Sequence, residues 1–386
     1  MLATSVAGLP LMLSGCGDDD DEPEEFSTEQ ASPPEIAEGT PTPTAEPIAS
    51  PVPGFLDPNR WQGRSIAIAT AGAGDYLNAL KSAFFEPFSE ATGATVRHEP
   101  FGRDGIANLK DQVENEERVW DIVLVPTDEI LGLASRPYLE AIDYAAVDSA
   151  ALYPELCMQH GVGAALYSTV QVYAANNPTP PENWATFWDL TQAAGSRALR
   201  KSPVGTLEFA LLADGVATDD LYPIDTERAF AKLETIREAT IFYEDSKQPV
   251  ELVRSEQVGL ASAWNVRTSL PDVASLVGIQ WQGGMISADS WAILRGTENA
   301  DVAMSFIAFS TRAVPTANFS QLQPFGPVNT DALKLLPDSV LVHMPNTEER
   351  MAQQFFMNFS YWNERREQLT DQFETWWLNP PATPEA

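Results

Sequence analysis

The chain has 386 residues, with 23 Lys and Arg against 55 Asp and Glu, and a formal net charge of −32 at pH 7. This balance argues against nucleic acid as a partner, because nucleic-acid binding depends on Lys and Arg at phosphates. Two cysteines allow no disulfide framework, and three histidines without neighbouring ligands at metal spacing predict no metal site and no cofactor.

The N-terminus carries the marks of an export signal. The apolar run from Leu2 to Leu13 is too short to span a bilayer, which takes about 20 residues, so it is interpreted as the apolar region of a signal peptide. The stretch from Leu13 to Cys16 resembles the lipobox of bacterial lipoproteins, in which the cysteine is acylated. Residues 1–16 are therefore predicted to be a lipoprotein signal, with Cys16 as the lipidation site. The alternative is a buried apolar cysteine.

An acidic tether is predicted over residues 17–59. Between Cys16 and Pro53 there are eleven acidic residues and no Lys or Arg, interleaved with Pro and Thr. Such a segment buries too little apolar surface to offset its ordering entropy, so it is expected to be disordered and extended. The rest of the chain is also acidic, which would attract a cationic solute or simply keep an exported protein soluble.

Strands and helices alternate in the first part of the body. The pattern predicts strands at Ser65–Thr70, Thr95–His98 and Trp120–Val125, and helices at Tyr76–Phe88, at Gly105–Asn115 and after Pro126-Thr127. This order is typical of an α/β domain with a parallel sheet. Gly72-Ala73-Gly74 follows the first strand but fails the dinucleotide spacing at Leu77. It is interpreted as a close approach of backbone to a small ligand, or as a plain tight turn.

Less regular elements follow, without an internal repeat. Strands are expected at Gly163–Tyr173, Arg197–Arg200, Thr240–Tyr243, Val258–Trp264 and Ser290–Leu294. Helices are expected at Trp184–Thr191, Thr206–Leu212, Asp225–Glu238, Val250–Gln257, Asp301–Thr311 and Thr347–Trp362. Trp184 and Trp188, four residues apart on one helix, are expected to lie in the core.

Several phrases, in this order and spacing, resemble the extracellular solute-binding proteins of bacterial ABC importers. They are Phe88–Gly93, Trp120–Thr127, Tyr138–Asp143 and Asn183–Leu190. Val258–Asn265 and Gly283–Ser290 narrow the resemblance to the branch typified by the spermidine/putrescine-binding proteins. The similarity extends from about Ser65 to about Trp377.

The resemblance implies a type II periplasmic-binding-protein fold of class α/β, with two lobes that are each a mostly parallel sheet flanked by helices and are hinged by crossover strands. Residues 60–173 plus 290–325 would form lobe 1, and residues 174–289 plus 326–380 would form lobe 2. It also implies a monomeric, lipid-anchored receptor on the outer face of the membrane. Its partners would be a small solute, cationic if a polyamine, and the subunits of an ABC permease.

The resemblance also implies a set of site residues. Trp264 falls on an aromatic-box position, and Asp289 falls on a carboxylate that receives an amine. Four more positions fall at or near family sites: Thr127, Phe325, Trp362 and Asn363. Three positions depart from the polyamine pattern, namely Ser287, Gly72 and Ala73.

The acids of the polyamine pattern are incomplete in this chain. Residues 200–206 stand where two further carboxylates are expected. Glu208 could replace one of them if its helix turns it inward; otherwise it is a solvated helix residue. Tyr76 is a ligand contact or a packing residue.

Alternatives to polyamine capture stay open at this point. The same fold could bind an amino acid, a sugar or ferric ion, although ferric ion would need clustered tyrosines. The chain could also be a tethered sensory module. A hydrolase is disfavoured, because no G-x-S-x-G, no HExxH and no convincing partner for Cys157 is present, with His160 three residues away.

Overall fold

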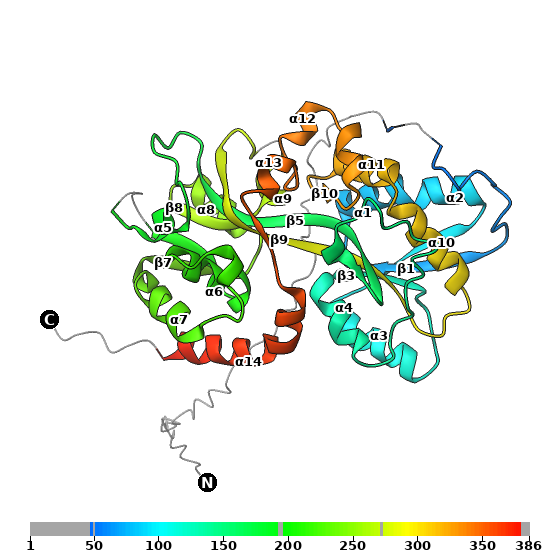
Figure 1. The fold of residues 1–386 in the computed structure, drawn as a ribbon, viewed down its shortest axis with the longest axis horizontal. Coiled ribbons are helices and arrows are strands. Elements are labelled where there is room, and N and C mark those ends of the chain that lie inside the picture. Colours follow the sequence, from blue (N-terminus) through cyan, green and yellow to red (C-terminus); the bar gives the residue numbers. More distant parts are fainter. Residues whose placement is uncertain (1–46, 49–50, 192–195, 271–272, 380–386) are drawn as a thin grey trace, which may run out of the picture. The chain divides into compact units, whose positions relative to one another are not determined.

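The computed structural model describes residues 47–48, 51–191, 196–270 and 273–379, and its centre is one long mixed sheet (Figure 1). At one end, β1 (Ser65–Thr70) lies between β2 (Thr95–Pro100) and β3 (Ile122–Pro126), and all three strands are parallel. At the other end, β6 (Ser196–Arg200) lies between β7 (Thr240–Tyr243) and β8 (Val258–Trp264), again in parallel. These two groups are called lobe 1 and lobe 2.

Two long antiparallel strands join the lobes. β5 (Gly161–Ala174) and β9 (Val277–Ile293) pair with each other along most of their length, β9 pairs with β3, and β5 pairs with β8 (Figure 1). Three two-residue strands extend this pair: β4 (Cys157–Met158) and β10 (Gly326–Pro327) along β5, and β11 (Phe355–Phe356) along β9. β9 crosses the predicted lobe boundary at residue 289, and the boundaries themselves remain a prediction.

Helices flank both parallel groups. Lobe 1 carries α1 (Gly74–Leu80), a π-helical segment (Lys81–Phe85), α2 (Glu86–Thr92), α3 (Gly105–Glu114), α4 (Thr127–Ala134), α10 (Ala300–Ser310) and α11 (Ala313–Leu322). Lobe 2 carries α5 (Trp184–Trp188), α6 (Pro203–Ala213), α7 (Thr226–Glu234), α8 (Gln248–Arg254) and α9 (Asn265–Thr268). The remaining helices are α12 (Asp338–Leu341), α13 (Glu348–Met351) and α14 (Phe359–Leu378).

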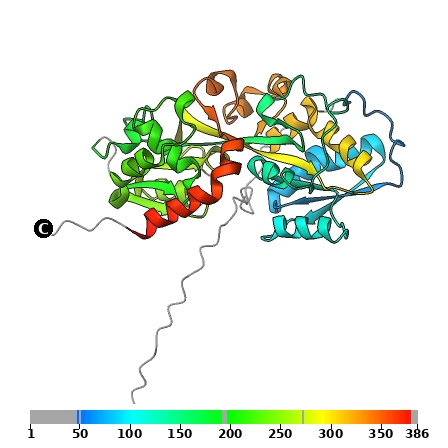
Figure 2. The same ribbon diagram turned by 60° about the horizontal axis from the view of Figure 1, so that its bottom comes forward.

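Helix α14 contacts both lobes (Figures 1 and 2, red). Arg366 forms an ion pair with Asp128 on α4. Further along, Phe373 packs against Phe230 on α7. Asn358 begins the helix by accepting a hydrogen bond from the Tyr361 amide at 2.9 Å, which is the usual role of an N-cap residue.

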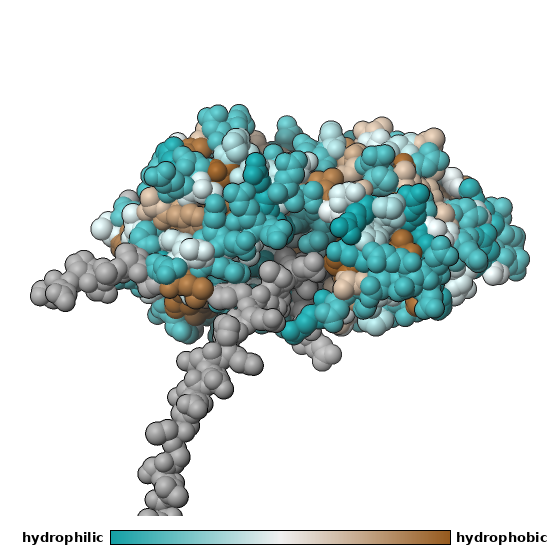
Figure 3. All heavy atoms as spheres, turned by 90° about the horizontal axis from the view of Figure 1, so that it is seen from below, coloured by the Kyte–Doolittle hydropathy of each residue, from teal (hydrophilic) through white to brown (hydrophobic). Residues whose placement is uncertain are grey.

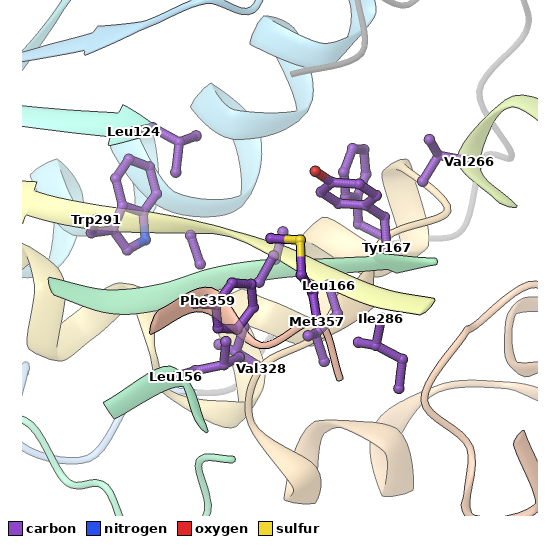
Figure 4. Packing of buried hydrophobic residues seen from close by; sticks show 14 of the residues in the cluster. Leu124, Leu156, Leu166, Tyr167, Val266, Ile286, Trp291, Val328, Met357 and Phe359 are labelled. Atoms are coloured by element: carbon purple, nitrogen blue, oxygen red, sulfur yellow. The ribbon is translucent and has the colours of Figure 1, made fainter. Parts of the chain in front are cut away.

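The core is continuous across the crossing strands. Figure 4 shows Leu166 of β5, Ile286 of β9 and the neighbouring Met357, which belong to one buried cluster with the aromatic residues of lobe 1. Trp184 and Trp188 are 2% and 7% exposed, so the prediction that they are core residues is confirmed. Burial of large aromatic side chains supplies much of the stabilisation of such a core.

The C-terminal segment differs from the sequence prediction. The expected helix Thr347–Trp362 is wrong: α13 ends at Met351, β11 follows, and α14 begins only at Phe359. Phe355 and Phe356 instead pair with Met285 and Ile286 of β9. Pairing with a strand distant in sequence has overridden the local helical periodicity.

Several further elements have different lengths from those predicted; α7, for example, was expected to reach Glu238 and ends at Glu234. The strand expected at Ser290–Leu294 is the end of the 17-residue β9, whose first half is interrupted by Gly283 with φ of +73°. The helix expected to reach Thr191 ends at Trp188.

The chain enters the body before residue 60. Val52 and Phe55 are each 7% exposed, and the Ile48 amide donates to Asn318 Oδ1 at 2.8 Å. The end of the predicted tether therefore packs on α11. In the part of the chain that the structure describes, no helix is long and apolar enough to cross a bilayer. Figure 3 shows a face dominated by hydrophilic residues, in keeping with the acidic composition.

Candidate functional site

Several of the predicted site residues gather where parallel strands end. β1 leads into Gly72 and Ala73, β3 leads into Thr127, and β8 ends at Trp264. Open α/β sheets bind ligands outside the carboxyl ends of their strands. The crossing strands contribute Ser287 and Asp289, because Asp289 pairs with Pro126 of β3 on one side and with Ala165 of β5 on the other.

Asp289 is a fully buried acid. It is 0% exposed, and neither of its carboxylate oxygens has a hydrogen-bond partner among the described residues. Burial raises the pKa of Asp289 from 3.8 to about 7, and the nearby Tyr76 hydroxyl opposes this rise. A buried carboxylate without a partner is costly, so its position suits a ligand that brings a positive charge and hydrogen-bond donors.

Four rings connect Asp289 to lobe 2, and we call them the aromatic wall: Tyr76, Phe325, Tyr167 and Trp264. Tyr76 lies 5.5 Å from Phe325 between ring centroids, Phe325 lies 6.1 Å from Tyr167, and Tyr167 meets Trp264 edge to face at 5.6 Å. Tyr76 is fully buried, and its hydroxyl, which interacts with Asp289, makes no hydrogen bond of good geometry within the described ranges. Three predicted residues therefore belong to one continuous cluster of rings, to which Tyr167 adds a fourth.

At the far end of the aromatic wall, a cation lies on the tryptophan. The guanidinium of Arg200, the last residue of β6, lies 4.8 Å from the centroid of the Trp264 ring. Among the described residues, Arg200 has no acidic side chain within ion-pair distance. Stacking on an aromatic face stabilises a guanidinium while leaving its N–H groups open to other acceptors.

Tyr167 lies between the two charges. Burial raises the pKa of Tyr167, the negative charge of Asp289 raises it further, and the positive charge of Arg200 lowers it. On β5, Ala165 pairs with Asp289 and Thr169 pairs with Trp264. At about 3.3 Å per residue and about 4.8 Å between strands, the Cα atoms of Asp289 and Trp264 are about 16 Å apart.

Other predicted residues support this region. The Thr127 hydroxyl lies 2.7 Å from that of Ser290, the residue after Asp289. Ser287 is the partner of Tyr167 in the β5–β9 ladder. A Cβ atom on Gly72 would lie 2.2 Å from the Tyr76 ring. The absence of a side chain at position 72 therefore allows the Tyr76 ring to lie where it does. Ala73 is exposed.

Glu208 and Trp362 form a separate cluster. The Glu208 carboxylate is 0% exposed and accepts hydrogen bonds from the Trp362 indole at 2.6 Å, the Tyr222 hydroxyl at 2.8 Å and the Gly205 amide at 2.9 Å. It is therefore neither a solvated helix residue nor an unpartnered acid comparable with Asp289. Asn363, the neighbour of Trp362, places Oδ1 against Gly132 of α4.

No group of metal-ligating side chains occurs in the described ranges. A groove of about 440 Å³ lies between α7 and α14, and none of the predicted site residues lines it. Its lining residues are Thr226, Glu227, Phe230, Asp371, Gln372, Thr375 and Trp376.

Sequence reasoning missed two members of the site, Tyr167 and Arg200. Both carry a recognisable signal. Tyr167 is a tyrosine with a polar hydroxyl inside an apolar strand, and Arg200 ends a strand in the same way as Trp264. Their proximity depends on the order of strands β6, β8, β5 and β9, which the sequence pattern did not supply.

Comparisons with known proteins agree with this architecture. A family model for bacterial extracellular solute-binding proteins matches residues 83–349. The gamma-aminobutyric acid-binding protein of Pseudomonas aeruginosa is 30% identical over 323 residues, which are 82% of this chain and 91% of that protein. The solved structure of the GABA receptor Atu4243 is 29% identical with a TM-score of 0.74, over 84% of this chain and 99% of that one. The spermidine/putrescine-binding protein of Streptococcus pneumoniae, at 17% identity, TM-score 0.65, and coverage of 81% and 99%, is similar in fold.

Proposed function

Because this chain belongs to the bacterial extracellular solute-binding protein family and is the substrate-binding receptor of an ABC importer, we propose that its solute is a zwitterionic ω-amino acid of the γ-aminobutyric acid (GABA) class. It has the type II periplasmic-binding-protein fold. Its role is to capture the solute and deliver it to a permease, without changing it chemically.

The observation that carries this proposal is the Arg200 guanidinium on the face of Trp264. In a polyamine receptor, as the sequence resemblance implies, an aromatic face receives an amine of the ligand. Here the protein's own cation lies on that face, so a ligand amine arriving there would meet a like charge. A ligand carboxylate, in contrast, would find the planar donor fork that Arg offers to carboxylates.

The opposite end of the aromatic wall has the opposite charge. Asp289 would receive the ligand ammonium, and the carbon chain would lie along Tyr167 and the neighbouring rings. With Cα atoms of Asp289 and Trp264 about 16 Å apart, the side chains leave a span that suits charges separated by several methylenes. An α-amino acid, whose charges are one carbon apart, would satisfy only one end.

A titration of the purified receptor tests this assignment. Isothermal calorimetry with GABA, 5-aminovalerate, alanine, putrescine and n-butylamine should rank the two ω-amino acids first. We expect putrescine to bind at least about 30-fold more weakly than GABA, because a charged hydrogen bond is replaced by a like-charge contact. Putrescine binding more tightly than GABA would restore the polyamine hypothesis.

The membrane attachment belongs to the same proposal. Acylation of Cys16 would hold the exported receptor at the outer face of a membrane, with the acidic segment as a spacer, and the receptor would work as a monomer. The family is extracellular, which supports export. Cys16 and residues 17–46 lie outside the described residues, so this part of the proposal rests on the sequence.

A further inference from the structure

The turn that carries Arg200 is shaped by hydrogen bonds to its own backbone. The Arg200 carbonyl accepts from the Ser202 amide at 2.8 Å and from the Thr206 hydroxyl at 3.0 Å. Gly205 has φ of +80°, in the left-handed region that favours glycine, and leaves the helical path within α6. We call residues 200–206 the Arg200 turn.

Glu208, which follows the Arg200 turn on α6, holds that turn in place through a hydrogen bond. Its Oε2 accepts from the Gly205 amide at 2.9 Å, and its Oε1 accepts from the Trp362 indole at 2.6 Å and from the Tyr222 hydroxyl at 2.8 Å. All three donors come from protein groups, and Glu208 is fully buried. The carboxylate therefore joins the Arg200 turn to Tyr222 and to α14.

We propose that Glu208 is a positioning residue that sets the place of the Arg200 guanidinium and so the preference for ligands with a carboxylate. This inference rests on the proposed function. It assigns a new role to a residue that the sequence offered as a replacement acid for an amine or as a solvated helix residue. Glu208 acts through Gly205 and the Arg200 turn, without touching the ligand. Small displacements of a charged group in a binding site change affinity strongly, so the support of the turn matters as much as the guanidinium.

The test compares two ligands that share an ammonium group and differ in the carboxylate. GABA carries both charges, and n-butylamine carries the ammonium alone, so the ratio of their dissociation constants reports on the Arg200 end of the site. Glu208→Gln keeps the volume of the side chain but turns an NH2 group toward one of the three donors. We expect the GABA dissociation constant to rise about tenfold and that of n-butylamine to stay unchanged, so the preference for GABA falls about tenfold.

Glu234→Gln is the matched control. Glu234 on α7 accepts from the Trp376 indole at 2.8 Å, which is the same donor type on the same helix, α14, and it pairs with Arg237, but it makes no hydrogen bond to the Arg200 turn among the described residues. This variant should keep the wild-type preference. A melting temperature measured for both variants separates general destabilisation from an effect on the ligand preference.

The outcomes are distinct. Equal weakening of both ligands in Glu208→Gln would mean that Glu208 meets the ammonium or supports the fold generally, and it would overturn the inference, as would an unchanged preference. If Glu208→Gln does not fold, Trp362→Phe decides, because it removes one donor and keeps a ring; its preference for GABA should fall in the same direction. A wild-type receptor that does not prefer GABA to n-butylamine would refute the proposed function first.

Discussion

Replacing Asp289 by asparagine should make the receptor more stable and less functional at once. The pKa of Asp289 is raised from 3.8 to about 7 by burial. One pKa unit corresponds to about 1.4 kcal/mol, so keeping this carboxylate ionised in the ligand-free fold costs about 4 kcal/mol above pH 7. The substitution Asp289→Asn removes that cost, because an amide stays neutral at every pH, and it nearly preserves the shape of the side chain.

The sign of the pH dependence follows from the raised pKa. Below about pH 4 the carboxyl is neutral in both the folded and the unfolded chain, and its contribution to stability is complete. As the pH rises toward 7, the unfolded chain is ionised while the folded one holds its proton, so stability is lost. The stabilisation by Asp289→Asn should therefore be small at pH 4 and grow until about pH 7.

Urea unfolding without ligand at pH 4 and pH 8 measures this difference, and calorimetry with GABA measures binding. Removal of one partner from a buried charge pair costs about 3 kcal/mol, so the GABA dissociation constant should rise about 100-fold. Asp331→Asn, at an exposed acid paired with Lys334, should change neither quantity. If Asp289→Asn is no more stable than the wild type at pH 8, or binds GABA normally, the reasoning about a buried, unpartnered carboxylate is refuted.

Three further substitutions address the rest of the proposal. Arg200→Met should weaken GABA binding about 50-fold and leave the melting temperature nearly unchanged, because the side chain is only half-buried; calorimetry showing equal affinity would contradict this. Trp264→Ala should weaken binding about tenfold by removing the face under Arg200, with circular dichroism confirming the fold. Cys16→Ser should move the receptor from the membrane fraction to the soluble fraction, and retention in the membrane fraction would argue against acylation there.

Local sequence patterns predicted the parallel parts of the fold well. The strands before Gly72 and Thr127 are short apolar runs with helices after them, and both features are local. The first half of β9 was missed because Gly283 and its neighbours interrupt the alternation of the strand. The helix expected at Thr347–Trp362 failed because β9 offers a pairing partner there.

The sequence supplied part of the candidate site. Asp289 and Trp264 were named from a resemblance, and they lie at the two ends of the aromatic wall. Arg200 was noticed only as a departure from an acidic pattern. The role of Arg200 depends on the Trp264 ring, which belongs to the neighbouring strand β8. No local sequence pattern shows that the ends of β6 and β8 lie side by side. The sequence indicates only that Glu208 lies on a helix, whereas its partners Tyr222 and Trp362 come from distant segments.

The stacked pair of Arg200 and Trp264 also bears on how receptors of this fold change cargo during evolution. The guanidinium of Arg200 covers one face of the Trp264 indole, whereas a small neutral residue at position 200 would leave that face open to a cationic ligand. A single substitution at the end of one strand would then remove the positive charge at this end of the candidate site, while the hydrophobic core stays as it is.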